Sequence, residues 1–165
     1  MTDIFKATGE ALANKGLRTV GKDFNRPWGG FFVIDEEQAQ AFADIYFDRL
    51  DVSGLRVAGK LSTKILLVKP GARLSWQYHH RRKETWRVVE GPVGIARSLT
   101  DEQGEVEVFK AGQTVVMEMG ERHRLVGLDN WGVVAEFWQH TDLEYPSDEE
   151  DIVRVQDDYQ RSTPA

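Results

Sequence analysis

Cysteine is absent from the 165 residues of the chain, which excludes disulfides, thiolate metal ligands and a cysteine nucleophile together. Long hydrophobic runs are absent as well. No apolar stretch approaches the roughly 20 residues that a membrane span requires, so we expect a soluble protein with no membrane partner. The first 16 residues carry scattered charge and lack the continuous apolar core of a secretory signal. These absences predict a cytoplasmic protein.

The chain has fewer basic than acidic residues: 21 lysines and arginines and 27 aspartates and glutamates give a formal net charge of -6. This balance argues against nucleic acid as a partner, although an acidic protein can hold an anion in a local basic pocket. The chain is long enough to bury one core without disulfides. We therefore expect a single domain over residues 1–165.

Short β-prone runs separated by turn residues fill the sequence from Leu61 onward, with a turn about every 8 to 20 residues, as in antiparallel sandwiches and small barrels. This pattern predicts an all-β fold, a jelly-roll-like barrel with its core over residues 60–140. Residues 1–59 form an extension of helix and strand, and residues 141–165 form a C-terminal segment. That segment is acidic and then amphipathic, so we expect a short helix that folds back over the barrel.

Two helices are expected in the N-terminal extension. The first spans roughly residues 4–17, before Gly21 and the RPWGG stretch at 26–30 break the chain ahead of a strand at 31–34. The second opens at Asp35, whose side chain can accept hydrogen bonds from free backbone N–H groups. Apolar residues then follow at helical spacing, namely Phe42, Ile45, Tyr46 and Leu50.

Polar residues with ligand chemistry gather in the β region. Gln77 and His79 lie two apart in one strand, so both side chains point to the same face. Glu84 has an odd offset from His79, and a turn or bulge between them must redirect it. His123 follows in a later strand, which a barrel can bring alongside. Two imidazoles, a carboxylate and an amide oxygen suit Zn²⁺ or a similar divalent ion.

Ordinary structural roles compete with this interpretation. A single histidine in a strand is more often a hydrogen-bonded structural residue than a ligand, and we favour that role for His80 and His140. Glu84 follows the basic run at 81–83 and could be a solvated ion-pair partner. Spacing alone leaves metal binding and these roles equally open.

The segment from Gly71 to Gly91 has a recognisable spacing: a glycine, five residues, a ligand pair two apart, a glutamate, six residues and a glycine. It resembles the first motif of the cupins, with Gln77 in place of the usual first histidine. A Gln-x-His pair at this point is characteristic of cupin-type mannose-6-phosphate isomerases. Four segments in order resemble the type II isomerase domain of that family: RPWGG at 26–30, VKPGARLSWQYHHRRKE at 68–84, GERHRL at 120–125 and EDIVRVQDDYQR at 150–161.

Several positions depart from the family pattern. The second cupin motif is looser, because the family usually has proline at the position of Glu118 and asparagine at that of Gly127. Thr85 stands where a second histidine is expected, next to the site, and this puts the exact substrate in doubt. Bifunctional relatives carry a nucleotidyltransferase domain ahead of this module. Nothing here resembles its glycine-rich nucleotide loop, so we do not expect guanylyl transfer.

The resemblance implies a cupin double-stranded β-helix in which Gln77, His79, Glu84 and His123 hold a divalent metal. Zn²⁺ is the favoured ion, with cobalt, manganese, nickel or iron as alternatives. The implied activity is a metal-dependent aldose–ketose isomerisation of mannose 6-phosphate to fructose 6-phosphate.

The resemblance also assigns candidate roles to basic residues. Lys64, Arg82 and Arg154 match basic positions of the family motifs and are candidates for binding the phosphate or polarising the substrate. If Trp76 and Tyr78 point out of the barrel, they form an apolar patch that the N-terminal helices or a second subunit must cover. We expect a homodimer.

Three other functions stay open. The same metal site could serve an isomerase of another free or phosphorylated sugar, such as a lyxose or heptose derivative. A non-catalytic sugar-binding or regulatory cupin would keep the fold without turnover. An iron-dependent dioxygenase usually needs three histidines or two histidines and a carboxylate, so Gln77 disfavours it.

Overall fold

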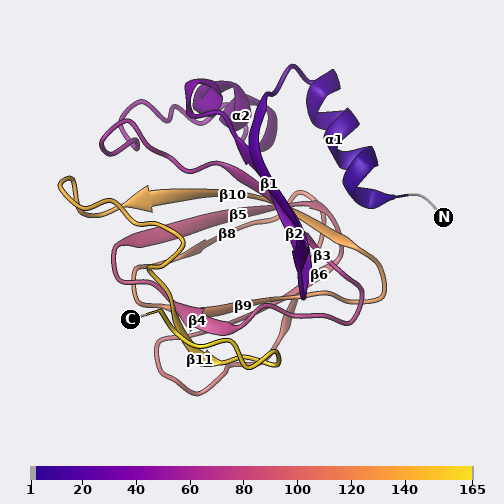
Figure 1. Cartoon of the computed structure of the whole chain (residues 1–165), viewed down its shortest axis with the longest axis vertical. Helices are drawn as coiled ribbons and strands as arrows, with labels where there is room; N and C mark the ends of the chain where they lie inside the picture. Colours follow the sequence, from indigo (N-terminus) through magenta and orange to yellow (C-terminus); the bar gives the residue numbers. More distant parts are fainter. Residues whose placement is uncertain (1–2, 165) are drawn as a thin grey trace.

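Two antiparallel sheets face each other in the computed structural model, which describes residues 3–164 (Figure 1). The six-stranded sheet has the spatial order β1 (Thr19–Arg26), β2 (Gly29–Ile34), β3 (Lys64–Val68), β10 (Gly132–His140), β5 (Arg82–Glu90) and β8 (Thr114–Met117). The five-stranded sheet has the order β11 (Val153–Gln156), β4 (Trp76–Tyr78), β9 (Arg122–Val126), β6 (Val93–Ser98) and β7 (Glu107–Phe109). The predicted all-β cupin barrel with N-terminal helices is confirmed.

The two faces of the six-stranded sheet have different coverings. Along β5, Glu84, Trp86 and Val88 are buried while the residues between them are half-buried, so one face of this strand points into the barrel. Strand β10 is buried at almost every position. Its two faces lie in different cores, since Val134 belongs to the barrel interior and Phe137 to the core outside it.

The outer core is covered by the N-terminal extension. Helix α1 (Ile4–Asn14), the 3-10 turn Glu36–Gln38 and helix α2 (Ala39–Tyr46) precede the barrel strands. Leu12 of α1 and Phe42 of α2 are buried against this face of the sheet. Figure 1 shows both helices on the side of the six-stranded sheet that faces away from β4, β9 and β11. The helices therefore leave the barrel interior free for the polar residues of the site.

Gly29 begins β2 beside the backbone of β3. Its φ is +146°, and a Cβ there would lie 1.9 Å from the backbone oxygen of Leu67. We expect Gly29→Ala to destabilise the fold by about 3 kcal/mol or more, because the contact is with backbone and the conformation is one that glycine alone adopts readily. Urea unfolding measures this. Gly54→Ala is the control, since no heavy atom lies within 4 Å of a Cβ there; equal midpoints for the two variants would contradict the prediction.

The N-terminal predictions are correct in outline and wrong at their boundaries. The helix from Asp35 is capped as expected, with the backbone N–H of Glu37 donating to the Asp35 side chain. It ends at Tyr46, however, because Asp48 and Arg49 adopt positive φ angles. Leu50 therefore lies outside the helix and is 41% exposed.

Gly21 does not break the chain, and it lies inside β1. The pairing of β1 with β2 has an irregularity between Thr19 and Gly21, so the strand tolerates the glycine as a bulge. The RPWGG stretch does turn the chain, and it connects β1 to β2.

The predicted C-terminal helix is wrong. Residues Val153–Gln156 form strand β11, which pairs with the free edge of β4, and Figure 1 shows this segment beside β4. The β-branched residues Ile152, Val153 and Val155 favour a strand, and β4 offers the unpaired backbone groups that an added strand needs. Pairing with the edge of β4 therefore determines the structure of this segment, although its amphipathic pattern favours a helix.

The outer face of β4 is covered by the chain itself. Trp76 is 2% exposed, and its indole N–H donates to the backbone oxygen of Asp101 at 2.8 Å. Arg122 stacks 3.8 Å above the ring of Tyr78 and pairs with Asp101. The argument for a homodimer from an uncovered patch on β4 therefore fails, and the homodimer itself stays a prediction. Neither α-helix of residues 3–164 is long and apolar enough to cross a membrane.

Candidate metal centre

Side chains with metal-binding chemistry converge inside the barrel from three strands. Gln77 of β4 is the direct register partner of His123 of β9, which explains why residues 46 positions apart meet. His79 follows β4, the chain turns at residues 79–81, and Glu84 then points inward from β5. All four are buried, and the two histidines and the glutamate are at most 2% exposed. The expected turn between His79 and Glu84 is present.

The potential ligand atoms lie within coordination range of a shared point. The Nε2 atoms of His79 and His123 are 3.3 Å apart. One oxygen of Glu84 lies 3.5 Å from Nε2 of His79, and the other lies 2.9 Å from Nε2 of His123. One ligand atom from each of these three residues lies within 4.8 Å of the others. This His–Glu–His group could hold a metal ion.

Backbone contacts determine how the two imidazoles are oriented. Nδ1 of His79 lies 2.6 Å from the backbone oxygen of Asp151, and Nδ1 of His123 lies 3.1 Å from that of Glu121. A carbonyl oxygen only accepts hydrogen bonds, so each Nδ1 carries the proton. When both imidazoles are neutral, the two Nε2 lone pairs face each other across 3.3 Å, an arrangement that a cation between them stabilises.

The charges of the group also fit a cation. Burial, together with the positive charge of Arg82, lowers the pKa of His79 to about 3, which keeps this imidazole neutral. Burial lowers the pKa of His123, but the charge of Glu84 more than offsets this and raises it overall. Oε2 of Glu84 is buried, and no hydrogen bond of good geometry reaches it. A carboxylate oxygen left this way beside two imidazoles suits a metal ligand.

Gln77 requires one adjustment to serve as a ligand. Its Oε1 accepts a hydrogen bond from Ser75, and its Nε2 lies 3.5 Å from Nε2 of His79. A half-turn of the amide would direct the oxygen toward the imidazoles, and the Ser75 hydroxyl could then accept from the amide nitrogen.

The segment after β10 supports the ligand loop. The carboxylate of Asp151 accepts hydrogen bonds from the backbone N–H groups of His80 and Arg81, at 2.9 and 3.0 Å, and from the Ser147 hydroxyl. Burial raises the pKa of Asp151, but the hydrogen bonds from Ser147 and the two backbone amides lower it overall. Asp151 thus holds the loop that carries His79 through both its side chain and its backbone.

We expect Asp151→Ala to weaken metal binding by about 10–100-fold, the usual cost of losing a residue that orients a ligand. Titration of the metal-free protein with Zn²⁺ measures the change. Asp142→Ala is the matched control, because Asp142 also accepts two backbone hydrogen bonds but on an exposed turn. Unchanged affinity in Asp151→Ala would show that the loop holds His79 without this carboxylate.

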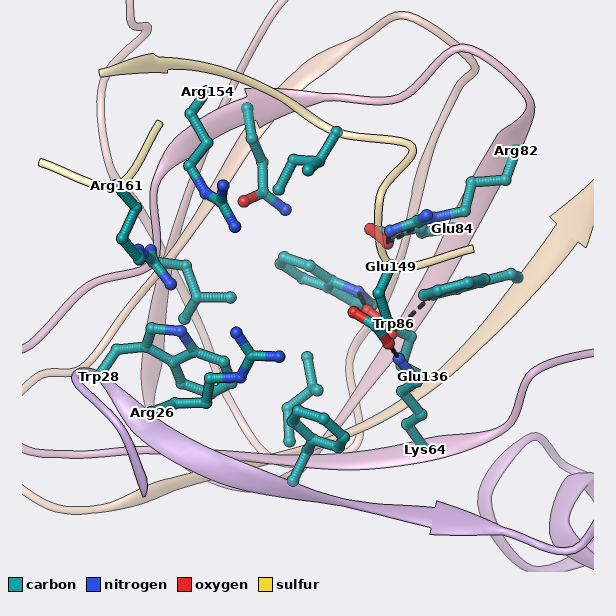
Figure 2. Close-up of a pocket in the computed structure, with 16 residues that line it drawn as sticks. Arg26, Trp28, Lys64, Arg82, Glu84, Trp86, Glu136, Glu149, Arg154 and Arg161 are labelled. Atoms are coloured by element: carbon teal, nitrogen blue, oxygen red, sulfur yellow. Dashed lines mark hydrogen bonds and ion pairs between the residues drawn. The ribbon is translucent and has the colours of Figure 1, made fainter. Parts of the chain in front are cut away.

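A cavity that is open to solvent extends from Glu84 and Gln77 across the barrel. Three arginines line its far side: Arg26 at the end of β1, Arg154 of β11 and Arg161 near the C-terminus. Figure 2 shows these guanidinium groups directed into the cavity, opposite Glu84 and Lys64. The cavity therefore has a carboxylate-containing end and a strongly basic end.

The basic end has unsatisfied donors. Nε of Arg154 is buried without a hydrogen-bond partner, although Nη1 donates to the backbone oxygen of Ser162. Burial and then the positive charge of Arg161 lower the pKa of Arg154, with a smaller contribution from Arg26. Arg161 is paired with Asp157 at 2.8 Å and Arg26 with Asp23 at 3.1 Å. Both arginines still repel Arg154, so a bound anion would stabilise the group.

The three basic residues singled out from the sequence all line this cavity, but they lie at different places in it. Arg154 belongs to the basic end. Arg82 lies at the metal end, 3.1 Å from Glu84 and 3.3 Å from Nε2 of His79. Lys64 forms an ion pair with Glu149 and lies 4.3 Å from the Trp138 ring.

Four residues at or beside the cavity were not predicted from the sequence, namely Arg26, Glu136, Asp151 and Arg161. Arg26 and Arg161 lie in the RPWGG and EDIVRVQDDYQR segments, so their family resemblance was the available signal. Glu136 interrupts an apolar strand, and Asp151 ends an acidic run. His140 lies outside the ligand group and hydrogen-bonds Ser62 and Ser147, as its expected structural role requires.

Comparison with known proteins identifies the family. A family model described as "Mannose-6-phosphate isomerase C-terminal" matches residues 36–157. The xanthan biosynthesis protein XanB of Xanthomonas campestris pv. campestris (strain B100) is 31% identical over 151 residues, covering 91% of this chain and 26% of that protein. A mannose-1-phosphate guanylyltransferase of Salmonella montevideo is 29% identical over 152 residues, covering 92% of this chain and 26% of that protein.

Both relatives are much longer, and the chain spans about a quarter of their length. Among solved structures, the capsular polysaccharide assembling protein CapF of Staphylococcus aureus superposes with a TM-score of 0.53 at 16% identity, over 85% of this chain and 34% of that one. This likeness supports the fold. The chain belongs to the family of mannose-6-phosphate isomerase C-terminal domains, a cupin family of sugar-phosphate metabolism.

Proposed function

We propose that this chain is a metal-dependent aldose–ketose isomerase that interconverts mannose 6-phosphate and fructose 6-phosphate. The observation that carries the proposal is the polarity of one cavity, which Gln77 and Glu84 of the ligand group line at one end and three arginines line at the other. A sugar phosphate has matching ends, since its carbonyl and hydroxyl oxygens suit a divalent cation and its phosphate suits guanidinium groups. The family's name supports the same substrate class.

In this proposal, Gln77, His79, Glu84 and His123 hold the cation, with Zn²⁺ as the favoured ion. A divalent cation, when bound, polarises carbonyl and hydroxyl oxygens as a Lewis acid. Arg82 lies against both Glu84 and His79, so we assign it to positioning these ligands and to polarising the substrate.

At the other end, Arg154 binds the phosphate together with Arg26 and Arg161. Substrate phosphate held there fixes the distance of C1 and C2 from the metal end, and such positioning lowers the barrier of the reaction.

Thr85 does not argue for a different substrate. It lies between Glu84 and Trp86 on β5, both of which point into the barrel, so its side chain points to the opposite face. Thr85 is not among the residues that line the cavity.

The test is a turnover assay with protein stripped of metal and then refilled with zinc, cobalt or manganese. We expect conversion of mannose 6-phosphate to fructose 6-phosphate that depends on the metal. A panel of free and phosphorylated lyxose and heptose sugars separates this activity from isomerisation of another sugar. Metal binding with no turnover of any sugar would contradict the proposal and favour a sugar-binding role.

A further inference from the structure

A buried carboxylate lines the cavity beside Lys64, on the same side as Glu84 (Figure 2), and has no part in the functions assigned above. Glu136 is 4% exposed and lines the cavity from β10. Its register partners are Lys64 of β3 on one side and Trp86 of β5 on the other. Figure 2 shows Glu136 close to Lys64 and Trp86, below Glu84.

Two indole groups hold this carboxylate in place. Nε1 of Trp86 donates to one oxygen of Glu136 at 2.6 Å, and Nε1 of Trp138 donates to the other at 2.8 Å. Each oxygen keeps lone pairs that can accept a proton. The side chain is therefore fixed in one orientation and still able to exchange a proton with a molecule in the cavity.

The surroundings of Glu136 bring its pKa close to neutral pH. Burial, followed by the charge of Glu84, raises the pKa of Glu136 to about 7. Burial lowers the pKa of Lys64 to about 8, against the opposing charge of Glu136. General acid–base catalysis works best when the pKa of the group lies near the working pH. The other charged groups that face this carboxylate are Arg82 on β5 and Glu149 in the segment after β10, which pairs with Lys64.

Glu136 also lies at a suitable separation from the metal end. Trp138 is the register partner of Glu84, so Glu136 is the diagonal neighbour of Glu84 on the inward face. Diagonal neighbours in an antiparallel pair are about 7–8 Å apart. A sugar whose oxygens contact a cation at the metal end therefore brings C1 and C2 into reach of Glu136.

We propose that Glu136 is the catalytic residue that carries the proton between C2 and C1 of the sugar, an inference that rests on the proposed isomerase function. The Glu136 carboxylate removes the proton from C2 of the aldose as the C1–C2 double bond of an enediol forms, and the carbonyl oxygen on C1 takes a proton from water in the cavity, which is open to solvent. The same group then returns a proton to C1, while the hydroxyl on C2 gives its proton back to water and becomes the ketone. No oxidant or reductant is needed.

The test compares metal-loaded wild type with Glu136→Gln, which keeps the size of the side chain. We expect kcat to fall by about 100–10,000-fold, the usual contribution of general acid–base catalysis, while KM and bound metal stay within about threefold. In heavy water, the wild type incorporates deuterium at C1 of the ketose, and the variant loses this incorporation together with turnover. A purely structural role would instead lower the unfolding midpoint or the metal content.

Glu107→Gln is the matched control, because Glu107 is 63% exposed in its side chain on the edge strand β7, and it should behave as wild type. Should Glu136→Gln fail to fold, Glu136→Asp replaces it, and the same fall in kcat at constant KM is expected. Wild-type kcat in the folded variant overturns the role of Glu136 and leaves the isomerase proposal intact. A wild-type protein without isomerase activity overturns both.

Discussion

A His123→Ala variant is expected to bind divalent metal more than about 100-fold more weakly than the wild type, because even the loss of an outer residue costs about 10–100-fold. The imidazole lost is 1% exposed, and its Nε2 lies within 3.3 Å of His79 and 2.9 Å of Glu84. No side chain of equal chemistry can replace it. Titration with Co²⁺, whose visible spectrum reports coordination, measures the change, and isomerase turnover should fall to background with it.

His80→Ala is the matched control for this experiment. His80 lies beside His79 in the sequence, but its side chain is exposed and its contact with Asp151 uses the backbone N–H. We expect wild-type metal affinity in this variant. Wild-type affinity in His123→Ala as well would mean that the ion binds elsewhere.

The second large effect is expected at the basic end of the cavity. A hydrogen bond to a charged group contributes about 1.5–3 kcal/mol, so Arg154→Ala and Arg161→Ala should each raise KM for mannose 6-phosphate by about 10–150-fold. Inorganic phosphate should also become a weaker competitive inhibitor by a similar factor. If free mannose is turned over at all, its KM should not change, because it lacks the group that the arginines bind.

Arg18→Ala controls for the loss of positive charge. Arg18 pairs with Asp35 on the surface, and its side chain is 59% exposed, so its removal should cost at most about 1 kcal/mol of stability and leave KM unchanged. An unchanged KM in both cavity variants would contradict phosphate binding at this end.

The candidate metal ligands could be predicted from the sequence because their arrangement depends on local strand geometry or on a recognisable motif. The alternation of a strand is enough to place Gln77 and His79 on one face, and the odd offset of Glu84 required the turn that the structure contains. His123 needed more than local pattern, since its neighbour across the sheet is 46 residues away. Only the resemblance to a cupin motif could connect the two strands in advance.

The prediction of a C-terminal helix was wrong because the residue pattern within a segment does not show that another strand has a free edge. Residues 153–156 pair with β4, a strand some 75 positions earlier in the chain, and this pairing carries Arg154 into the cavity. For the helix after Asp35, the start was predictable and the end was not. Its cap follows from one residue, but the sequence does not indicate the positive φ angles of Asp48 and Arg49 that end it.

Glu136 offered a signal that pattern analysis can use. A glutamate in the apolar run VVAEFWQ stands at a position where the strand is buried on both faces, and a buried carboxylate requires partners. The sequence does not say that those partners are two indole N–H groups and Lys64, since all three come from cross-strand or same-face neighbours.

The most direct test of a metal end and a phosphate end in one cavity is a crystal structure of the zinc-loaded protein with fructose 6-phosphate. The anomalous signal of zinc identifies the ion, and the electron density identifies the phosphate. Zinc bound by His79, Glu84 and His123, with the phosphate against Arg26, Arg154 and Arg161, is the result we predict. Zinc outside this group, or the phosphate away from the arginines, would contradict the account.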